Sequence, residues 1–215
     1  MPGKQSHVIL DKRDISPSVF VLRLERNGFN FDPGQYVFIN LPGETYVREY
    51  SIYSGADDPY IEFLIKEVSD GFVSAKLRKS NPGDQLEIDG PFGFFTLNEA
   101  FYSTPPLLLI STGSGIAPFH SFIRSRPSLK YRLIHGVRDC IETYEKNIYH
   151  HYVLCTSRDN TGDYHGRVSQ YLKENPVSTD FWCYLCGNYE MILEVTEILI
   201  KQGIPFAHIY SEVHN

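Results

Sequence analysis

Residues 48–54, "REYSIYS", combine a strand-forming pattern with side chains that can bind a ligand. Ile52 and its neighbours favour an extended strand. Arg48, Tyr50 and Ser51 place a guanidinium, a phenol and a hydroxyl along the same short stretch, and all three groups form hydrogen bonds. Two interpretations are open: an exposed edge strand with a solvated arginine, or a strand that lies along a ligand and directs its polar groups at that ligand.

A glycine-rich stretch in the second half, "STGSGIAP" (residues 111–118), is typical of a turn that binds phosphate. Gly113 and Gly115 allow the backbone to approach a ligand closely, and Pro118 suits the first turn of a following helix. Backbone N–H groups at such a helix start can bind an anion. The usual dinucleotide fingerprint has glycine or alanine where Pro118 stands, so a purely structural turn explains the stretch equally well.

A second stretch of this kind, "DGFVS" (residues 70–74), lies in the first half. Gly71 can turn the chain, and Ser74 can begin a short helix whose amides and hydroxyl would hold another phosphate group. An ordinary capped helix is the alternative.

These stretches require a scaffold, and the first half of the chain predicts an antiparallel barrel or sandwich. Short strand-like runs alternate with turns rich in Gly, Pro and Asp, which is the spacing of such folds. The runs are residues 7–14, 18–25, 35–41, 48–54, 60–68 and 84–89. Residues 71–80 are more helical.

The pattern changes near residues 98–106, where strand-like apolar runs begin to alternate with helical segments. This alternation predicts a parallel sheet covered by helices. The runs are residues 105–112, 130–137, 151–157, 181–187 and 206–212. In the last long helical segment we expect one buried face, made of Met191, Ile192, Val195, Leu199 and Ile200. We therefore predict two domains, residues 1–101 and 102–215.

The composition narrows the function classes. Of 215 residues, 42% are hydrophobic, which suffices for a core, and the formal net charge of -6 argues against nonspecific binding to nucleic acid or to an anionic membrane. No apolar run approaches the ~20 residues of a membrane helix, and the first 14 residues lack the apolar segment of a signal peptide. We predict a cytoplasmic protein without membrane insertion; the sequence makes no prediction of oligomeric state.

The four cysteines do not predict a metal site. Cys183 and Cys186 have C-x-x-C spacing, but "FWCYLCG" has the pattern of a strand, which directs these two side chains to opposite faces. A metal site also needs more ligands than one such pair. Reduced cysteines fit a cytoplasmic protein.

Taken together, the motifs resemble those of the ferredoxin–NADP⁺ reductase family, and most closely the compact bacterial ferredoxin- or flavodoxin-NADP⁺ reductases. The family pattern Arg-x-Tyr-Ser-x-x-Ser stands here at residues 48–54, and Gly-x-x-Ser at residues 71–74. "NPGDQLEIDGPFGFF", "STGSGIAP", the Gly-Val-Arg of residues 136–138, Ser157 with Arg158, and the Cys-Gly-x-x-x-Met of residues 186–191 follow in family order. The resemblance covers most of residues 33–212.

The resemblance implies an FAD-binding barrel followed by an NADP(H)-binding α/β domain. Arg48 would bind the flavin pyrophosphate, Tyr50 would lie against the isoalloxazine or ribityl chain, and Ser51 would reach flavin N5. Tyr50 as an ordinary core residue is the alternative. The implied flavin-binding residues are Arg48, Glu49, Tyr50, Ser51, Leu64, Ile65, Lys66, Gly71, Phe72, Val73 and Ser74.

The second set of residues would bind the nicotinamide coenzyme. It comprises Thr112, Gly113, Val137, Arg138, Ser157, Arg158, Arg167, Cys186, Gly187, Asn188 and Met191. By resemblance, Arg158 and Arg167 bind the 2′-phosphate of NADP(H). The alternatives make them surface partners of Asp159 and Asp163, or make Asp139 or Asp159 an acid that favours NAD(H).

By the same resemblance, Ser51, Tyr50, Cys186 and Glu212 act in catalysis. Family members often end in an aromatic residue over the flavin, whereas this chain ends in "YSEVHN". Tyr210, His214 or neither would cover that flavin face.

The implied activity is hydride transfer between NADP(H) and FAD, with single electrons exchanged with a separate ferredoxin or flavodoxin. The basic stretch of residues 76–80, "KLRKS", would dock that carrier, or it is a solvated helix end. Three alternatives remain: an NAD(P)H-dependent flavin, ferric or quinone reductase; a noncatalytic electron-transfer subunit of a larger complex; and a fold relative that binds neither cofactor.

Overall fold

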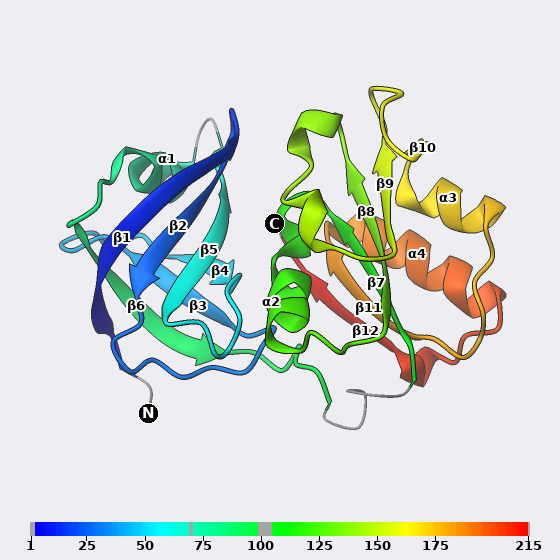
Figure 1. Cartoon of the computed structure of the whole chain (residues 1–215), viewed down its shortest axis with the longest axis horizontal. Coiled ribbons are helices and arrows are strands. Elements are labelled where there is room, and N and C mark those ends of the chain that lie inside the picture. Colours follow the sequence, from blue (N-terminus) through cyan, green and yellow to red (C-terminus); the bar gives the residue numbers. More distant parts are fainter. Residues whose placement is uncertain (1–2, 69–70, 99–104, 215) are drawn as a thin grey trace. The chain divides into compact units, whose positions relative to one another are not determined.

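The structure, a computed structural model, describes residues 3–68, 71–98 and 105–214, which form two compact units (Figure 1). Unit 1 comprises Met1–Thr96 and Ala117–Ser125, and unit 2 comprises Leu97–Ile116 and Arg126–Asn215. The predicted boundary between residues 101 and 102 lies outside the described residues, so its position stays a prediction.

Unit 1 contains a six-stranded sheet in which every neighbouring pair is antiparallel, in the order β4-β3-β6-β1-β2-β5. Its strands are β1 (Gln5–Ser16), β2 (Val19–Glu25), β3 (Tyr36–Asn40), β4 (Arg48–Ser51), β5 (Tyr60–Lys66) and β6 (Gln85–Phe92). Each falls within or overlaps a strand-like run expected between turns rich in Gly, Pro and Asp, so the antiparallel prediction is confirmed.

The two ends of this sheet meet just beyond β4. Ile52 forms an antiparallel bridge with Phe63 of β5, and the amide of Tyr53 donates to the carbonyl oxygen of Glu62 at 2.7 Å. The amide of Glu62 in turn donates to Ser54 Oγ at 3.0 Å. These bonds close the sheet into a barrel, whose interior is filled by the inward residues of all six strands, such as Ile39, Phe63 and Ile88.

Two helices pack on the barrel. Helix α1 (Phe72–Lys79) contributes Val73 and Leu77 to its core. Helix α2 (Ala117–Ser125) belongs to the same unit: Ser121 Oγ donates to the carbonyl oxygen of Ser54 at 2.7 Å, and the His120 ring stacks on that of Tyr53 at 3.7 Å. Burial of His120 lowers its pKa to about 3, so this ring is neutral.

Unit 2 contains a six-stranded sheet in which every neighbouring pair is parallel, in the order β10-β9-β8-β7-β11-β12. Its strands are β7 (Leu107–Thr112), β8 (Tyr131–Val137), β9 (Tyr152–Thr156), β10 (Tyr164–His165), β11 (Trp182–Gly187) and β12 (Ile209–Val213). The chain fills the sheet outward from β7 on one side, then returns to place β11 on the other, so the strand order reverses at β7. The predicted parallel α/β organisation is confirmed.

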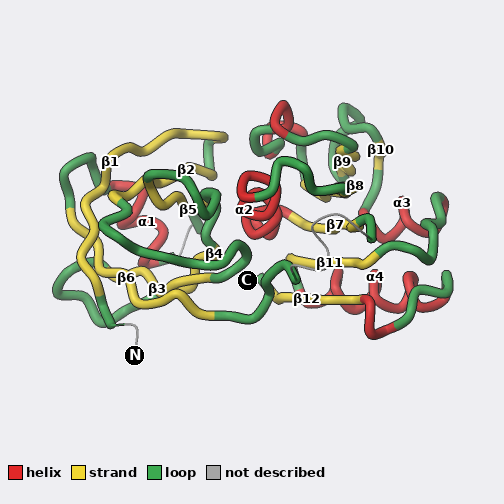
Figure 2. Tube along the Cα trace, turned by 60° about the horizontal axis from the view of Figure 1, so that its bottom comes forward, coloured by secondary structure: helices red, strands yellow, loops and turns green. Residues whose placement is uncertain are grey.

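Helices α3 (Val168–Glu174) and α4 (Tyr189–Lys201) pack against this sheet (Figure 2). The buried face of α4 contains four of the five expected residues, together with Ile198. The prediction for Ile200 is wrong, because its side chain is 45% exposed. At 100° per residue Ile200 lies about 180° from Met191, on the outer face of the helix. Short 3₁₀ turns occur at η2 (Gly113–Ile116), η3 (Cys140–Glu142), η4 (Lys146–Ile148) and η5 (Phe206–His208).

We predict that Ser54→Ala weakens the barrel closure. The substitution leaves the buried amide of Glu62 without its acceptor, which costs about 1–3 kcal/mol in the free energy of unfolding. Urea denaturation measures this change. Ser6→Ala, which alters an exposed serine of the same unit, should stay within about 0.5 kcal/mol of the parent. Equal stability of Ser54→Ala and the parent would contradict the assignment.

Candidate functional site

The side chains of β4 alternate between two faces of the sheet. Arg48 lies opposite Ile39 and Tyr50 opposite Val37, and residues paired across an antiparallel ladder share a face. Ile39 and Val37 are buried in the barrel core, and Tyr50 packs against that core from its rim. Arg48 and Tyr50 therefore lie on one face. Glu49, which is exposed, and the buried Ser51 occupy the other.

The polar groups of β4 are available to a ligand. The guanidinium of Arg48 is exposed, and its hydrogen bond within the described residues is from Nη1 to the carbonyl oxygen of Val47 at 3.1 Å. Burial raises the pKa of Tyr50 to about 12, with nearby Arg48 opposing the shift, so the phenol is a hydrogen-bond donor at neutral pH. Among the described strands, none but β3 pairs with β4, so the outer edge of residues 48–51 is free.

The other predicted flavin-binding residues lie in the same unit. Leu64, Ile65 and Lys66 end β5, beyond the bridge at Phe63. Gly71 precedes α1, whose first turn contains residues 72–74 with amides that have no partner within the helix. The ring of Phe72 lies 4.8 Å from that of Tyr46, two residues before β4. The structure thus brings the start of α1 next to the start of β4.

Ser74 has a different local role from the one expected for its hydroxyl. Its Oγ accepts a hydrogen bond from the amide of Val68 at 3.2 Å and donates to the carbonyl oxygen of Gly71 at 3.5 Å. The hydroxyl therefore holds the loop before α1, which leaves the amides of the first turn to meet a ligand.

In unit 2, the predicted coenzyme residues gather at the carboxyl ends of the parallel strands. Thr112 ends β7 in register with Gly136, and Val137 ends β8 in register with Thr156. Ser157 and Arg158 follow β9, and Arg167 follows β10 and precedes α3. Gly187 ends β11, with Asn188 and Met191 at the start of α4. Ligands of open α/β sheets bind at this edge, where the strand order reverses.

The turns after β7 and β11 are in direct contact. A Cβ atom on Gly115 would lie 2.5 Å from the carbonyl oxygen of Cys186, and one on Gly187 would overlap Thr112 Oγ1. Real Cβ atoms do not approach this closely, so both positions require glycine. Asn188 Oδ1 accepts from the amide of Met191 at 2.8 Å and caps α4. Its side chain is thereby committed to the helix.

Within the part of the chain that the structure describes, the arginines of this edge form no close ion pair, although Arg167 adds a small contribution, after those of Lys173 and Ser169, to the lowered pKa of Glu194. In the described residues, no ion pair involves Arg138, Arg158 or Arg167. Asp159 instead accepts hydrogen bonds from the Cys140 amide (2.7 Å) and from Thr161, which lower its pKa below the usual range. Asp163 accepts from the amide of Leu154 at 2.8 Å and lies 3.7 Å from Lys146 Nζ. The alternative that made these aspartates the partners of Arg158 and Arg167 is wrong.

Cys186 and Glu212 are brought together, since they are register partners in β11 and β12. Cys186 is fully buried, and burial, with a smaller contribution from Glu212, raises the pKa of its thiol well above the usual value. The thiol is therefore protonated and is not a nucleophile. Cys183, three residues earlier in the same strand, packs with the helix side of the core, and the four cysteines are free thiols.

The end of the chain lies next to the same edge. The amide of His214 donates to the carbonyl oxygen of Gly187 at 2.8 Å. The ring of Tyr210 stacks on that of Tyr184 at 4.8 Å within unit 2. Of the two residues considered as a flavin cover, Tyr210 is thus packed in its own unit, whereas His214 is held at the predicted nicotinamide turn.

Sequence analysis did not select two residues that contact this site. His135 in β8 is fully buried, and its Nε2 lies 2.9 Å from the carbonyl oxygen of Gly113. Its Nδ1 lies 2.8 Å from the hydroxyl oxygen of Tyr152. The one signal in the sequence is a histidine within an otherwise apolar strand pattern, "RLIHGV".

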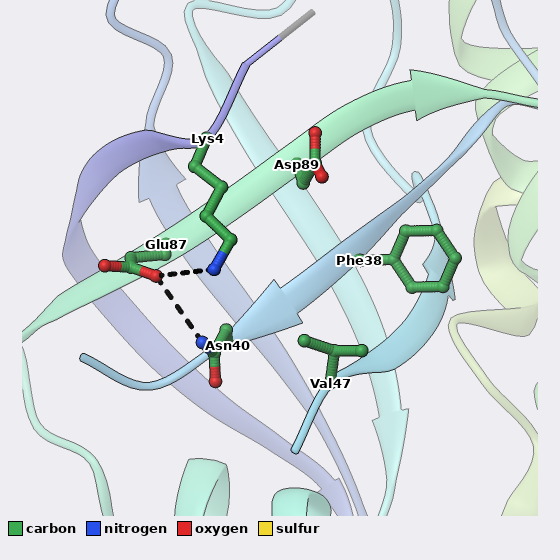
Figure 3. A pocket seen from close by; sticks show the side chains of 6 residues that line it. All are labelled: Lys4, Phe38, Asn40, Val47, Glu87 and Asp89. Atoms are coloured by element: carbon green, nitrogen blue, oxygen red, sulfur yellow. Dashed lines mark hydrogen bonds and ion pairs between the residues drawn. The ribbon is translucent and has the colours of Figure 1, made fainter. Parts of the chain in front are cut away.

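A pocket of about 140 Å³ lies on unit 1 beside the start of β4 (Figure 3). Lys4, Phe38, Asn40, Val47, Glu87 and Asp89 line it, and Lys4 Nζ and Asn40 Nδ2 both reach Glu87 Oε2. None of these residues belongs to the predicted flavin set, but the pocket borders it, because Val47 accepts the hydrogen bond of Arg48 and Phe38 is the register partner of Glu49.

Two further observations bear on the predicted classes. Among residues 3–68, 71–98 and 105–214, no helix has the length and apolarity needed to cross a bilayer. The same residues contain no group of three or more His, Cys, Asp or Glu side chains placed to hold a metal ion.

Comparisons with known proteins agree with this geometry. Residues 6–97 match the sequence family of the oxidoreductase FAD-binding domain. The chain is 30% identical to the toluate 1,2-dioxygenase electron transfer component of Pseudomonas putida, over 95% of this chain and 66% of that protein. It is 28% identical to the reductase component of a naphthalene 1,2-dioxygenase system from the same species, a ferredoxin–NAD(P)⁺ reductase, over 86% and 60%.

The chain thus spans about three fifths to two thirds of the length of these curated relatives. Among solved structures, it is similar to a ferredoxin–NADP⁺ reductase from Neisseria gonorrhoeae with bound FAD and NADP. The TM-score is 0.88 at 23% identity, over 98% of both chains. The motifs, the antiparallel barrel and the parallel sheet lead to the same assignment: the chain belongs to the ferredoxin–NADP⁺ reductase family of oxidoreductases.

Proposed function

We propose that this chain binds FAD on unit 1 and NADP(H) at the carboxyl edge of the unit 2 sheet, and that it transfers electrons between NADP(H) and a separate carrier protein. The observation that carries the proposal is the distribution of unpaired cations. Arg48 beside the free edge of β4, and Arg138, Arg158 and Arg167 at the edge of the parallel sheet, form no close ion pair with a carboxylate among the described residues.

The residues of unit 1 fit FAD. Arg48 is a fork of donors suited to a pyrophosphate. The first-turn amides of α1 and the free edges of β4 and β5 supply further donors close to it. Tyr50 offers a half-buried ring on the same face as Arg48, and Ser51 a hydroxyl on the other face. Glu49 is exposed between them.

The residues of unit 2 fit a phosphorylated dinucleotide. The turns at Thr112–Gly113 and Gly187–Asn188 meet where the strand order reverses, and Val137 and Met191 line the adjoining strand and helix ends. Ser157 and the three arginines supply donors for a 2′-phosphate, which supports NADP(H) over NAD(H). When bound, the flavin accepts hydride from the nicotinamide and exchanges single electrons, chemistry that belongs to the cofactors.

The carrier is proposed to be a ferredoxin or flavodoxin, as the resemblance implies. The docking role expected for residues 76–80 gains little support. Lys76 pairs with Glu44, and Arg78 pairs with Asp14 and Glu67, so much of the positive charge is neutralised within unit 1. A second candidate, the reductase component of an oxygenase system, is favoured by the two relatives named above, which are components of dioxygenase systems.

We also propose a cytoplasmic location. The support is that all four cysteines are free thiols, which is typical of reducing compartments.

The first test compares electron acceptors. With NADPH as donor, we expect the purified protein to reduce one protein carrier faster than free flavin, ferric citrate or a quinone, and to show saturation with that carrier. Ferredoxins, flavodoxins and an oxygenase component are tested in parallel, with NADH alongside. If the small acceptors are reduced as fast as every protein carrier, the chain is a flavin, ferric or quinone reductase instead. A protein without flavin absorption would end the enzyme proposals.

We predict that Arg48→Ala weakens flavin retention. A charge-assisted contact to pyrophosphate contributes roughly 1.5–3 kcal/mol, so the dissociation constant of FAD should rise about ten- to a hundredfold. Dialysis followed by absorption spectroscopy measures the loss. Lys79→Ala removes one positive charge from an exposed residue of the nearby α1 and should leave retention unchanged. Equal retention in Arg48→Ala and the parent would remove β4 from the flavin site.

We predict that Arg158→Ala and Arg167→Ala weaken the binding of NADPH but not that of NADH. Each arginine on a 2′-phosphate contributes roughly 1.5–3 kcal/mol, so the KM for NADPH should rise about ten- to a hundredfold while that for NADH hardly changes. Steady-state kinetics with both coenzymes give the comparison. Lys130→Ala, an exposed cation immediately before the amino end of β8, is the charge control. Equal losses for the two coenzymes would refute the 2′-phosphate assignment.

A further inference from the structure

His135 is a buried polar residue in the middle of the parallel sheet. Its side chain is fully buried, and it lies in register with Ser111 of β7 and Leu154 of β9. Tyr152 lies opposite Leu133, two residues before His135, so the tyrosine and the histidine share one face of the sheet. The ring of Tyr144 packs 5.6 Å from that of His135. No solvent-borne substrate can reach this imidazole, so the residue has no direct part in the proposed reaction.

Both ring nitrogens of His135 are engaged, and their partners determine the tautomer. The Gly113 carbonyl, 2.9 Å from Nε2, can only accept, so Nε2 carries the proton. Nδ1 then presents a lone pair, which accepts the hydroxyl proton of Tyr152 at 2.8 Å. Burial lowers the pKa of His135 to about 4 and raises that of Tyr152, so both groups stay neutral near pH 7. The result is a hydrogen-bond relay, in which the Tyr152 hydroxyl donates to the imidazole and the imidazole donates to the Gly113 carbonyl.

This relay sets the orientation of one peptide in the predicted phosphate turn. In a planar trans peptide, the carbonyl and the following N–H point in opposite directions. Because the carbonyl of Gly113 points inward to His135, the amide of Ser114 points the other way. Ser114 is half-buried, and its amide lies in the first turn after β7, where no intrahelical acceptor exists.

We propose that His135 and Tyr152 are positioning residues for the dinucleotide: they hold the Gly113 carbonyl inward and so present the Ser114 amide to a phosphate of the coenzyme. The inference rests on the proposed function of this edge. It adds a requirement for coenzyme binding that is separate from the one proposed for the arginines. The arginines act on the 2′-phosphate of NADP(H) alone, whereas the turn contacts the diphosphate common to NADPH and NADH.

The test compares three substitutions in the full-length protein. His135→Leu removes both hydrogen bonds, and the KM for NADPH and for NADH should rise by a similar factor, roughly tenfold for a lost buried hydrogen bond. The kcat at saturation and the flavin content should stay within about twofold. His135→Gln keeps an N–H where Nε2 stood and should restore both KM values to within about threefold of the parent. Tyr152→Phe retains the imidazole donor but not its fixed tautomer, and should raise both KM values about threefold.

Tyr171→Phe is the matched control. Its hydroxyl accepts from Arg132 in the same unit and is not bonded to the glycine turn, so its removal should leave both KM values unchanged. If His135→Leu does not fold, His135→Gln and Tyr152→Phe still test the positioning role.

The positioning role would be overturned by a KM change confined to NADPH, by a loss in His135→Gln as large as in His135→Leu, or by equal behaviour of Tyr152→Phe and Tyr171→Phe. A parent protein that retains flavin but binds neither coenzyme would refute the proposed function of this edge itself. Coenzyme binding by the parent without any loss in the variants refutes the positioning role alone.

Discussion

The contact between the turns after β7 and β11 is the constraint on which the second half of the molecule depends. Gly115 lies against the carbonyl oxygen of Cys186, and Gly187 lies against the Thr112 hydroxyl. No side chain fits at either glycine, so backbone meets backbone where the strand order reverses. Under the proposed function, a ligand at this edge meets the backbone amides of these turns as well as the neighbouring arginine and serine side chains, and both kinds of donor suit a phosphate.

The barrel also leaves backbone groups unpaired, but by a different arrangement of its strands. A closed barrel normally leaves no free strand edge, yet closure here is made beyond β4, by Ile52 and by the bonds of Tyr53 and Ser54 to Glu62. The four residues of β4 thereby keep one edge unpaired although the sheet as a whole is closed. This explains why the polar stretch begins with Arg48 and ends in buried residues: the first part keeps an unpaired edge, which the proposed function assigns to a ligand, and the second part holds the sheet together.

Sequence analysis predicted most elements because strand-forming runs and turn residues are clearly separated along the chain. Strand-like runs between turns rich in Gly, Pro and Asp identified the six barrel strands, and compact apolar runs identified five of the six parallel strands. The two-residue β10 was missed because so short a strand has no period. Ile200 was assigned to the buried face because its side chain is hydrophobic, although its angular position around the helix axis places it on the outer face. His135 and Tyr152 could not be recognised, since their significance depends on three strands that meet only in the folded sheet.

Buried polar residues and exposed arginines differ in their hydrogen-bond partners. Two buried ones hold backbone groups: Ser54 binds the amide of Glu62, and His135 holds the carbonyl of Gly113. Desolvation makes an unpaired buried group costly, so the hydrogen bonds of Ser54 and His135 favour one geometry of each side chain. The exposed arginines pay no such penalty and can remain unpaired until an anion arrives. Under the proposed function, backbone donors placed by buried residues and exposed arginines together form a site that binds phosphate groups without reorganising its own frame.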